Sequence, residues 1–284
     1  MIAITGANGN LGKATLSFLL KKTNPADIIA IVRNPEKMQD LVHTGIKIRI
    51  ADYNDHVLLN EALQGVDTVL QISSSSAGEQ ATQEEHNVVK AAKQQGVKHI
   101  VYTSTLDPHD GSYFMAAHTC LHTENAIKES GAAYTIFRNS MYMETVPLFI
   151  GSAMEDGNVQ YPGSDGKVSF ASRIDIAEAL SNVLVSDAHN NRTYNITGSK
   201  AYSFGDIAGL LKTAMRMPSS SYANIPLDAY REALASYEMP EGEIEFYLSM
   251  ANSIRSNEFA RTDDALEQIL QRKRLSLEEY LGNI

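Results

Sequence analysis

Three glycines near the start of the chain, Gly6, Gly9 and Gly12, have a spacing that suits phosphate binding. They follow the apolar run Met1 to Ile4, and their pattern GxxGxxG is a variant of the fingerprint with which a strand and the next helix hold a dinucleotide. We expect Gly6 and Gly9 to take backbone angles that a Cβ forbids, and Gly12 to let the helix approach the strand closely. The helix N-terminus adds free N–H groups for a pyrophosphate. The predicted binding turn, for which an ordinary tight turn is the alternative, comprises Gly6, Ala7, Asn8, Gly9, Asn10, Leu11 and Gly12.

The residue after the second apolar run, 27 to 32, distinguishes the two nicotinamide cofactors. A site for NAD usually has an acid there, which holds the ribose 2′-hydroxyl. This chain has Arg33, followed by Asn34. A guanidinium group suits the 2′-phosphate of NADP, which an acid would repel. We therefore expect NADP(H) as the cofactor, the alternative being that Arg33 is only a solvated surface charge.

Polar residues also lie at the ends of three further predicted strands. Asp52 ends the third strand, where its carboxylate either accepts from the adenine amino group or begins the next helix. Ser73, Ser74 and Ser75 follow the fourth strand and offer hydroxyls and amides to the nicotinamide ribose, unless they form only a flexible polar loop. Thr103 lies near the end of the fifth strand. We expect all five residues to contact the cofactor.

The end of the sixth strand, with the sequence RNSMYME, carries further candidates. Asn139 and Tyr142 are expected to line the cleft beside the nicotinamide. Arg138 either joins them as a cofactor ligand or is structural, paired to an acid such as Glu124 or Glu144. An aromatic ring beside two flexible methionines favours a flat, apolar acceptor over a charged hydroxy acid.

The helix after the fifth strand lacks a feature of short-chain dehydrogenases. Those enzymes use a Tyr and a Lys four residues later to exchange a proton with a carbonyl group. This helix has His118 and His122, with Cys120 between them. His118 is the candidate catalytic residue, donating a proton or a hydrogen bond to the reduced acceptor, and a satisfied or surface histidine is the alternative. Zinc needs further ligands that the sequence does not offer, so we expect no metal site.

Composition excludes several classes of protein. The 284 residues carry a net charge of −10, which argues against a nucleic-acid footprint. No stretch reaches the ~18 apolar residues that a membrane span needs. The single cysteine cannot form an intrachain disulfide, and the chain starts on a strand without a signal peptide, so we expect a cytoplasmic protein. Both a monomer and a homodimer fit the sequence.

Strands and helices alternate with short connections through the first 150 residues, which indicates a parallel sheet with helices on both faces. We predict an α/β NAD(P)-binding Rossmann fold with a small, mostly helical C-terminal lobe. Ligands then lie at the carboxyl ends of the strands. The predicted strands are 1–4, 27–32, 46–50, 68–73, 100–104, 134–138 and 193–197, and the predicted helices are 55–63, 83–95, 115–129 and 173–186.

The pattern also predicts how the chain is divided. Residues 1–150 form the NADP-binding core, to which 168–198 return, and residues 199–284 form the small substrate lobe. Between them, residues 151–167 are rich in Gly, Asp, Asn and Ser, which predicts a loop or short hairpin covering the cleft.

Several segments resemble the NmrA-like group of atypical short-chain dehydrogenases: MIAITGANGNLG, IVRNPEK, ISSSS, AAKQQGVKHIVYTS and YTIFRNSMYMET. Within this group the chain most resembles the branches that reduce quinones with NADPH and that reduce triphenylmethanes. The resemblance implies an NADP(H)-binding Rossmann core, a small C-terminal substrate lobe and direct hydride transfer without the Tyr and Lys pair. His118 falls at a histidine of the triphenylmethane branch, whereas Cys120 replaces a histidine of both branches.

These observations predict an NADPH-dependent reductase that transfers hydride to a quinone or a similar conjugated acceptor. Such acceptors are electrophilic enough for positioning and exclusion of water to suffice. The alternative is a redox sensor of the NmrA type that binds NADP(H) and acts through a protein partner. The predicted aromatic and methionine lining favours catalysis, because a sensor needs no acceptor pocket.

Overall fold

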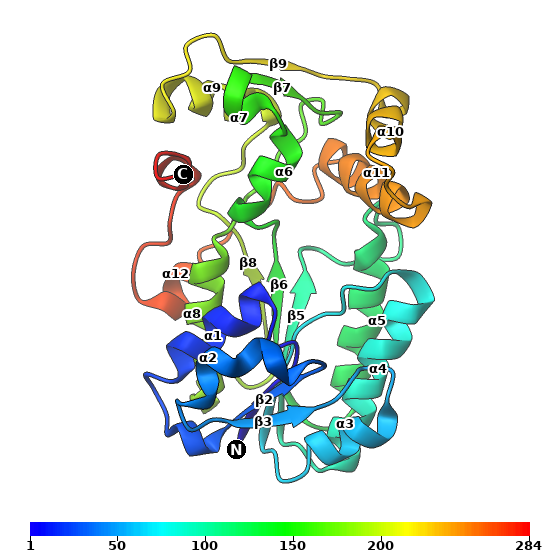
Figure 1. Cartoon of the computed structure of the whole chain (residues 1–284), viewed down its shortest axis with the longest axis vertical. Helices are drawn as coiled ribbons and strands as arrows, with labels where there is room; N and C mark the ends of the chain where they lie inside the picture. Colours follow the sequence, from blue (N-terminus) through cyan, green and yellow to red (C-terminus); the bar gives the residue numbers. More distant parts are fainter.

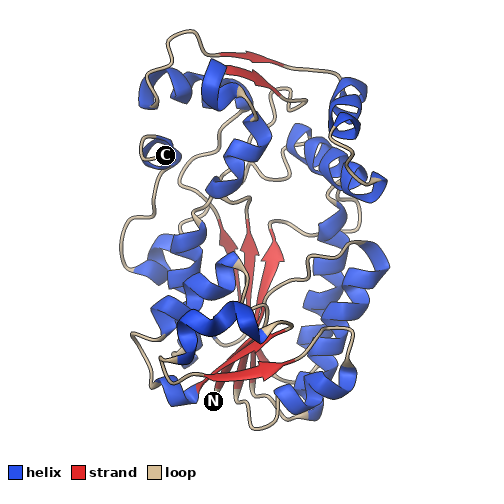
Figure 2. Ribbon diagram, in the orientation of Figure 1, coloured by secondary structure: helices blue, strands red, loops and turns tan.

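A parallel seven-stranded sheet forms the centre of the computed structural model, which describes residues 1–284 apart from the side chains of Asp40 and Val42 (Figures 1 and 2). The spatial order is β3-β2-β1-β4-β5-β6-β8. The order reverses between β1 and β4, and a crevice for ligands forms at such a switch point. The predicted Rossmann fold is confirmed. The strands are β1 (Ile2–Ile4), β2 (Ile28–Val32), β3 (Lys47–Ile50), β4 (Thr68–Gln71), β5 (His99–Thr105), β6 (Ala133–Asn139) and β8 (Arg192–Ile196).

Helices cover both faces of the sheet, because its strands are apolar on both sides. In β5, for example, Val101 packs into one hydrophobic cluster, whereas Ile100 and Tyr102 pack into the other. The cluster that contains Val101 also holds side chains of α1 (Asn10–Leu19) and α8 (Arg173–Leu184). The opposite cluster holds side chains of α3 (His56–Ala62), α4 (Gly78–Gln94) and α5 (Met115–Glu129). A short helix, α2 (Gln39–Val42), precedes β3.

A second body of packed side chains lies beyond the carboxyl ends of the strands, and the arrows of β5, β6 and β8 point toward it in Figures 1 and 2. Its centre is aromatic, with the rings of Tyr161 and Phe204 stacked at 4.1 Å between centroids. The elements of this small lobe are α6 (Val146–Ile150), α7 (Ala153–Asp156), β7 (Asn158–Gln160), α9 (Phe204–Ala214), β9 (Ser221–Ala223), α10 (Leu227–Ser236), α11 (Glu241–Arg255) and α13 (Leu277–Leu281). None of the described helices is both long and apolar enough to cross a bilayer.

The prediction for residues 151–167, a loop or short hairpin covering the cleft, is only partly right, because residues 161–167 are loop and turn but the segment is not a hairpin. This segment forms α7 and β7, and β7 pairs in parallel with β9, with Asn158 opposite Ser221, so it is not a hairpin. Within β7 the side chain of Val159 is buried, whereas Asn158 and Gln160 are exposed. This alternation drives a strand into the lobe despite the polar composition of the segment. None of its residues lines either of the two pockets described below.

The C-terminal segment does not stay in the small lobe. The helix α12 (Ala265–Leu270) packs against α8, and Leu266, Ile269 and Leu270 join the hydrophobic cluster that covers one face of the sheet. Part of the region that we assigned to the lobe therefore lies against the Rossmann core. The chain then returns to the lobe through α13, where Leu277 and Leu281 are buried.

Candidate active site

Two pockets meet at the loop after β4, which contributes residues 73–76 to both. The first, which we call the glycine-turn pocket, has a volume of about 420 Å³ and lies at the carboxyl ends of β1, β2 and β3. Its lining comprises Gly6, Asn8, Gly9, Ile31, Val32, Arg33, Asn34, Lys37, Ala51, Asp52, Tyr53, Ile72, Ser73, Ser74, Ser75, Ser76 and Glu84. The second, which we call the aromatic pocket, has a volume of about 400 Å³ and lies between the core and the small lobe.

The three glycines differ in whether, and why, the structure requires a glycine at their positions. Gly6 has φ of +59°, a left-handed conformation that favours glycine. Gly9 has an ordinary φ of −71°, so our expectation of an unusual backbone angle there is wrong. A Cβ on Gly12 would lie 2.4 Å from the carbonyl oxygen of Gly6, which enforces the close approach of α1 to the turn.

The glycine turn leaves donors open at the start of α1. Gly9 is the N-cap residue and has no side chain that could cap the helix, and the first helical turn has no acidic residue. The first N–H groups of α1 therefore lack helical partners. Of the predicted binding turn, the structure brings Gly6, Asn8 and Gly9 to the pocket wall, while Ala7, Asn10, Leu11 and Gly12 lie outside that lining.

Cationic side chains border the far end of the glycine-turn pocket. The Arg33 side chain is 75% exposed, and Asn34 and Lys37 line the pocket beside it. One Arg33 nitrogen, Nη1, lies 3.9 Å from Oδ2 of Asp52. The N-cap of α3 is Asp55, whose Oδ1 accepts from the N–H of Leu58 at 2.9 Å. Asp52 is therefore not the helix cap and faces the pocket instead.

The serine loop is held in place by side chains beneath it. The N–H of Ser73 donates to Oγ1 of Thr103 at 2.9 Å, and the N–H of Ser74 donates to Oε1 of Glu85 at 2.8 Å. The hydroxyl of Ser76 donates to Oε1 of Glu84 at 3.0 Å. Thr103 is buried and lines neither pocket, so it positions Ser73 rather than reaching a ligand itself. These bonds argue against the alternative of a flexible polar loop.

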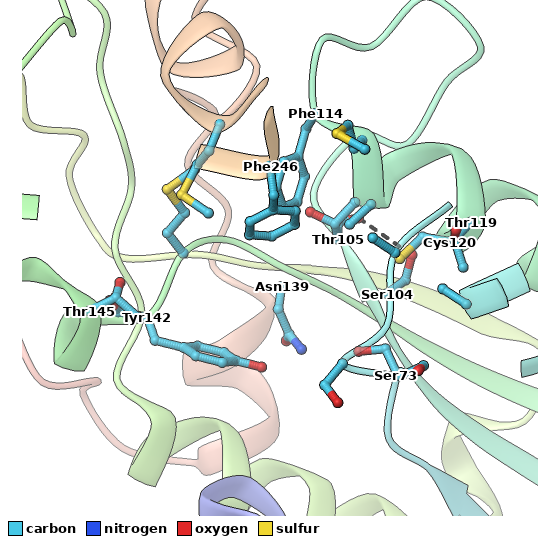
Figure 3. A pocket seen from close by; sticks show the side chains of 18 of the residues that line it. Ser73, Ser104, Thr105, Phe114, Thr119, Cys120, Asn139, Tyr142, Thr145 and Phe246 are labelled. Carbon is cyan, nitrogen blue, oxygen red and sulfur yellow. Dashed lines mark hydrogen bonds between the residues drawn. The ribbon is translucent and has the colours of Figure 1, made fainter. Parts of the chain in front are cut away.

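The wall of the aromatic pocket includes six aromatic and three methionine side chains, and Phe114, Phe246 and Tyr142 are among those labelled in Figure 3. The ring of Phe114 lies 5.5 Å from those of Phe246 and Phe259, between centroids. Among the lining residues that the structure describes, none is Lys, Arg or His, and Glu85 is the acid. The lining comprises residues 73–78, Ala81, Glu85, Ser104, Thr105, Phe114, Met115, Ala116, Thr119, Cys120, Asn139, Ser140, Met141, Tyr142, Thr145, Leu148, Phe149, Phe246, Tyr247, Met250 and Phe259.

Sequence reasoning missed Glu85. Its side chain is 1% exposed, and its Oε2 accepts from the hydroxyl of Tyr102 at 2.5 Å. Burial raises the pKa of the Glu85 carboxyl and raises the pKa of the Cys120 thiol to about 12, so the thiol stays protonated near neutral pH. The only feature of the sequence that could have pointed to Glu85 is the pair of consecutive glutamates, Glu84 and Glu85, in the helix after the serines.

Asn139 and Tyr142 both line the aromatic pocket, and Figure 3 shows the hydroxyl of Tyr142 pointing toward the amide of Asn139. Asn139 is 6% exposed, and neither polar atom of its amide has a hydrogen-bond partner among the described residues. Burial raises the pKa of Tyr142 to about 12. The guanidinium of Arg173 lies 5.0 Å from the centre of the Tyr142 ring.

Arg138 does not reach either pocket. Its Nε and Nη2 donate to the two carboxylate oxygens of Glu124 at 2.9 and 2.7 Å. Glu124 also accepts from the hydroxyl of Ser104 at 2.7 Å. The structure therefore shows Arg138 in the structural alternative, paired with Glu124, and not at the expected cofactor site. The alternation of side chains along β6 explains this arrangement, because Arg138 and Asn139 are consecutive residues of the strand and point to opposite faces of the sheet.

The structure does not bring His118, the predicted catalytic residue, to either pocket. His118 is exposed, lines neither pocket, and has its Nε2 3.1 Å from the carbonyl oxygen of Ser112. The face of α5 that meets the aromatic pocket presents Met115, Ala116, Thr119 and Cys120. At 3.6 residues per turn, position 118 lies on the other side of the helix from this group.

Comparison with known proteins gives matches along the whole chain. The model of the NmrA-like family matches residues 1–281. Quinone oxidoreductase 2 of Escherichia coli (strain K12) is 39% identical over 242 residues, which cover 85% of this chain and 84% of that protein. The NADPH complex of the NADPH-dependent quinone oxidoreductase from Escherichia coli has a TM-score of 0.93 at 34% identity, covering 100% of this chain and 99% of the other.

A second solved structure is similar over the same extent. The NADP(H) complex of the triphenylmethane reductase of Citrobacter sp. has a TM-score of 0.92 at 31% identity, covering 100% of this chain and 99% of the other. The predicted family is confirmed by the match over residues 1–281 and by the identity with the Escherichia coli protein. The chain belongs to the NmrA-like family.

Proposed function

We propose that this chain is an NADPH-dependent reductase that transfers hydride to conjugated acceptors that carry no negative charge, quinones above all. The observation that carries the proposal is the junction of two unlike pockets at one serine loop. The glycine-turn pocket has open N–H groups and cationic side chains, and the aromatic pocket is apolar. An anionic cofactor in the first pocket would meet a flat acceptor in the second.

The residues of the glycine-turn pocket fit NADP(H). The N–H groups at the start of α1 would hold the pyrophosphate, and Arg33 with Lys37 would hold the 2′-phosphate. Asp52 and the serine loop would contact the adenine and the nicotinamide ribose. When bound, the cofactor supplies the hydride. The relatives crystallised with NADPH and NADP(H) support this assignment.

The aromatic pocket supplies positioning and a dry environment. Phe114 and Phe246 present ring faces and edges against which a flat acceptor can stack, and Met115 with Met250 can adjust to its outline. Holding such an acceptor against the nicotinamide converts a bimolecular encounter into an oriented one. The apolar wall also excludes water, which would otherwise solvate the reacting groups.

The charges of the aromatic pocket narrow the acceptor class. With no basic residue in the described lining, the apolar pocket disfavours acceptors with carboxylate or sulfonate groups, because their charge would lose its water without gaining a partner. Delocalised cations are a second class, because a spread positive charge can stack on the aromatic rings of this pocket. Hydride transfer to a cation yields a neutral product without a proton donor, which suits a site that lacks the Tyr and Lys pair. The similarity to triphenylmethane reductase supports this second class.

The redox-sensor alternative is not favoured, because a sensor needs no acceptor pocket. The buried, protonated thiol of Cys120 suits a reducing compartment, and we place the reaction in the cytoplasm.

Three acceptors of related size test the proposal: a naphthoquinone, a sulfonated naphthoquinone and a cationic triarylmethane dye. The purified protein should oxidise NADPH steadily with the first and third, at rates well above a protein-free blank. The sulfonated compound should react about tenfold more slowly or worse, because its charge would be desolvated in a pocket without a basic partner. Oxidation of NADPH no faster than the blank with all three acceptors would refute the reductase function, and preference for the sulfonate would refute the acceptor class.

A further inference from the structure

The amide of Asn139 is a buried polar group without a partner. Neither its Nδ2 nor its Oδ1 makes a hydrogen bond to any described residue, although only 6% of the residue is exposed. Burying an amide in this way costs free energy unless another molecule satisfies it. The side chain lines the aromatic pocket, so the missing partner is a molecule that enters that pocket.

The backbone holds Asn139 rigidly. It is the last residue of β6, where it lies opposite Thr105 of β5 and Ile196 of β8, between two neighbouring strands. Its carbonyl oxygen accepts from the N–H of Leu106 at 2.9 Å. A side chain on such a frame is already oriented before a ligand binds, which is the condition for stabilising charge without reorganisation.

Tyr142 is fixed beside it. The backbone of Tyr142 forms a bridge with Ala171, and its ring lies under the guanidinium of Arg173. The hydroxyl points toward the Asn139 amide in Figure 3. Because burial raises the pKa of Tyr142 to about 12, this hydroxyl keeps its proton at neutral pH and can donate a hydrogen bond.

Two other hydroxyls of the pocket already have acceptors. The hydroxyl of Ser104 donates to Glu124 at 2.7 Å, and that of Thr145 donates to the carbonyl oxygen of Tyr142 at 2.6 Å. Donating to a ligand would require Ser104 or Thr145 to break its bond. The Nδ2 donor of Asn139 has no partner by distance and angle, although the amide lies near enough to the Tyr142 hydroxyl to lower the pKa of that group against the larger effect of burial.

We propose that Asn139 and Tyr142 form a neutral oxyanion-binding pair that stabilises the acceptor oxygen as it becomes negative during reduction. The inference rests on the proposed quinone reductase function. Hydride transfer carries two electrons and one proton from NADPH, which is oxidised to NADP⁺, to the quinone, which becomes a hydroquinone monoanion. A proton from solvent then completes the hydroquinone. The Nδ2–H of Asn139 and the hydroxyl of Tyr142 donate to the oxygen that carries the charge, and neither gives up its proton. These two residues are thus catalytic residues that take the place of the missing Tyr and Lys pair.

A probe that needs no turnover tests the pair. A nitronaphthol is flat, its phenolate resembles the hydroquinone monoanion, and its phenol and phenolate forms differ in colour. Titration of the probe bound to the NADP⁺-loaded protein gives its apparent pKa. In Asn139→Leu and in Tyr142→Phe that pKa should rise by about one unit relative to the wild type, since each loses one hydrogen bond to a charged oxygen. Asn139→Asp should raise it further, because its carboxylate repels the phenolate.

The controls separate this effect from a general loss of structure. Tyr237→Phe makes the same change as Tyr142→Phe at a side chain that is 80% exposed, and it should leave the apparent pKa of the probe unchanged. Circular dichroism and NADPH affinity should match the wild type in all variants. If Asn139→Leu instead weakens NADPH binding and leaves the pKa of the probe unchanged, the amide serves the cofactor and the proposal is overturned. An unchanged pKa in Tyr142→Phe as well, or a wild type that binds only the neutral phenol, overturns it too.

Steady-state rates distinguish this proposal from the function on which it rests. With a naphthoquinone, kcat of Asn139→Leu and of Tyr142→Phe should fall about tenfold while KM changes little. With a cationic triarylmethane dye kcat should not change, because no oxyanion forms. Equal losses with both acceptors contradict the oxyanion pair. A wild type that stabilises the bound phenolate but reduces no quinone contradicts the reductase function and leaves the pair as an anion-binding site.

Discussion

The two pockets differ in how they are assembled from the chain. The glycine-turn pocket is built from short local segments, in which the strand ends of β1, β2 and β3 each carry their ligand-facing residues directly behind them. The aromatic pocket joins α4, α5 and β6 with residues as distant as Phe246 and Phe259. In the first, residue type and position in the sequence determine the site. In the second, the packing of two hydrophobic clusters determines it, so its chemistry depends on which face each helix turns inward.

Gly12 offers the largest test of the local pocket. A Val at this position would place its Cβ 2.4 Å from the carbonyl oxygen of Gly6 and 2.7 Å from Cα of Ala7, and both are backbone atoms that cannot move aside cheaply. We expect Gly12→Val to lower the free energy of unfolding by about 3 kcal/mol or more, as measured by urea denaturation.

Gly9→Val is the matched control for this prediction. A Cβ on Gly9 meets only the carbonyl oxygen of Gly6, at 3.3 Å, and φ there is ordinary. Gly9→Val should therefore keep most of its stability and lose NADPH binding. If Gly12→Val unfolds at the same urea concentration as Gly9→Val, the close packing of α1 on the turn does not set the stability of this region.

The same contrast explains which parts of the fold and of the candidate site can be predicted from the sequence. The turn at residues 6–12 and the parallel sheet follow from local patterns, and α5 occupies the predicted residues 115–129. The pairing of β7 with β9 was missed because its partner lies 63 residues away, at Ser221, and the polar composition outweighed the burial of Val159. His118 was misplaced because a sequence gives the position of a residue on a helix but not which face the helix turns to the cleft. Glu85 escaped notice because a glutamate in a helix is usually solvated.

Arg33 gives the next largest effect, on cofactor choice. Charge-assisted hydrogen bonds contribute about 1.5 to 3 kcal/mol, so Arg33→Ala should weaken NADPH binding by roughly tenfold or more. NADH has no 2′-phosphate, and its affinity should barely change. Calorimetric titration with both cofactors measures the difference. Equal losses for the two would mean that the guanidinium does not read the phosphate, and that the local pocket depends less on its strand-end residues than we infer.

The pH dependence of the free energy of unfolding tests whether Glu85 is desolvated in the wall of the aromatic pocket. Because burial raises the pKa of Glu85, the folded protein holds this proton more tightly than the unfolded chain does. Its contribution to stability is present below the ordinary glutamate value of 4.5 and is lost as pH rises through the pKa of the folded state. Glu85→Gln does not titrate.

The free energy of unfolding of the wild type should therefore fall relative to that of Glu85→Gln as pH rises from about 4.5. Urea denaturation of both proteins across this range gives the difference directly. Glu84→Gln is the comparison of opposite sign: although burial opposes it, hydrogen bonds from Ser74 and neighbouring polar side chains lower the pKa of Glu84, so its contribution to stability is lost as pH falls. A constant difference between wild type and Glu85→Gln across the range would mean that Glu85 is not desolvated.

Replacement of His118 should have the smallest effect on the rate of reduction. This result tests which face α5 turns toward the aromatic pocket. The side chain is exposed on the face of α5 opposite to Thr119 and Cys120, and its contact is the carbonyl oxygen of Ser112 at 3.1 Å. An exposed side chain away from the reacting atoms changes stability by about 0.5 kcal/mol or less when replaced. His118→Ala should therefore leave kcat, KM and the pH dependence of the rate with a naphthoquinone unchanged, whereas Tyr142→Phe in the same assay lowers kcat. If His118→Ala lowers kcat by about 10² and removes a titration from the rate profile, α5 turns a different face to the acceptor, and the aromatic pocket is not the reaction site as drawn in Figure 3.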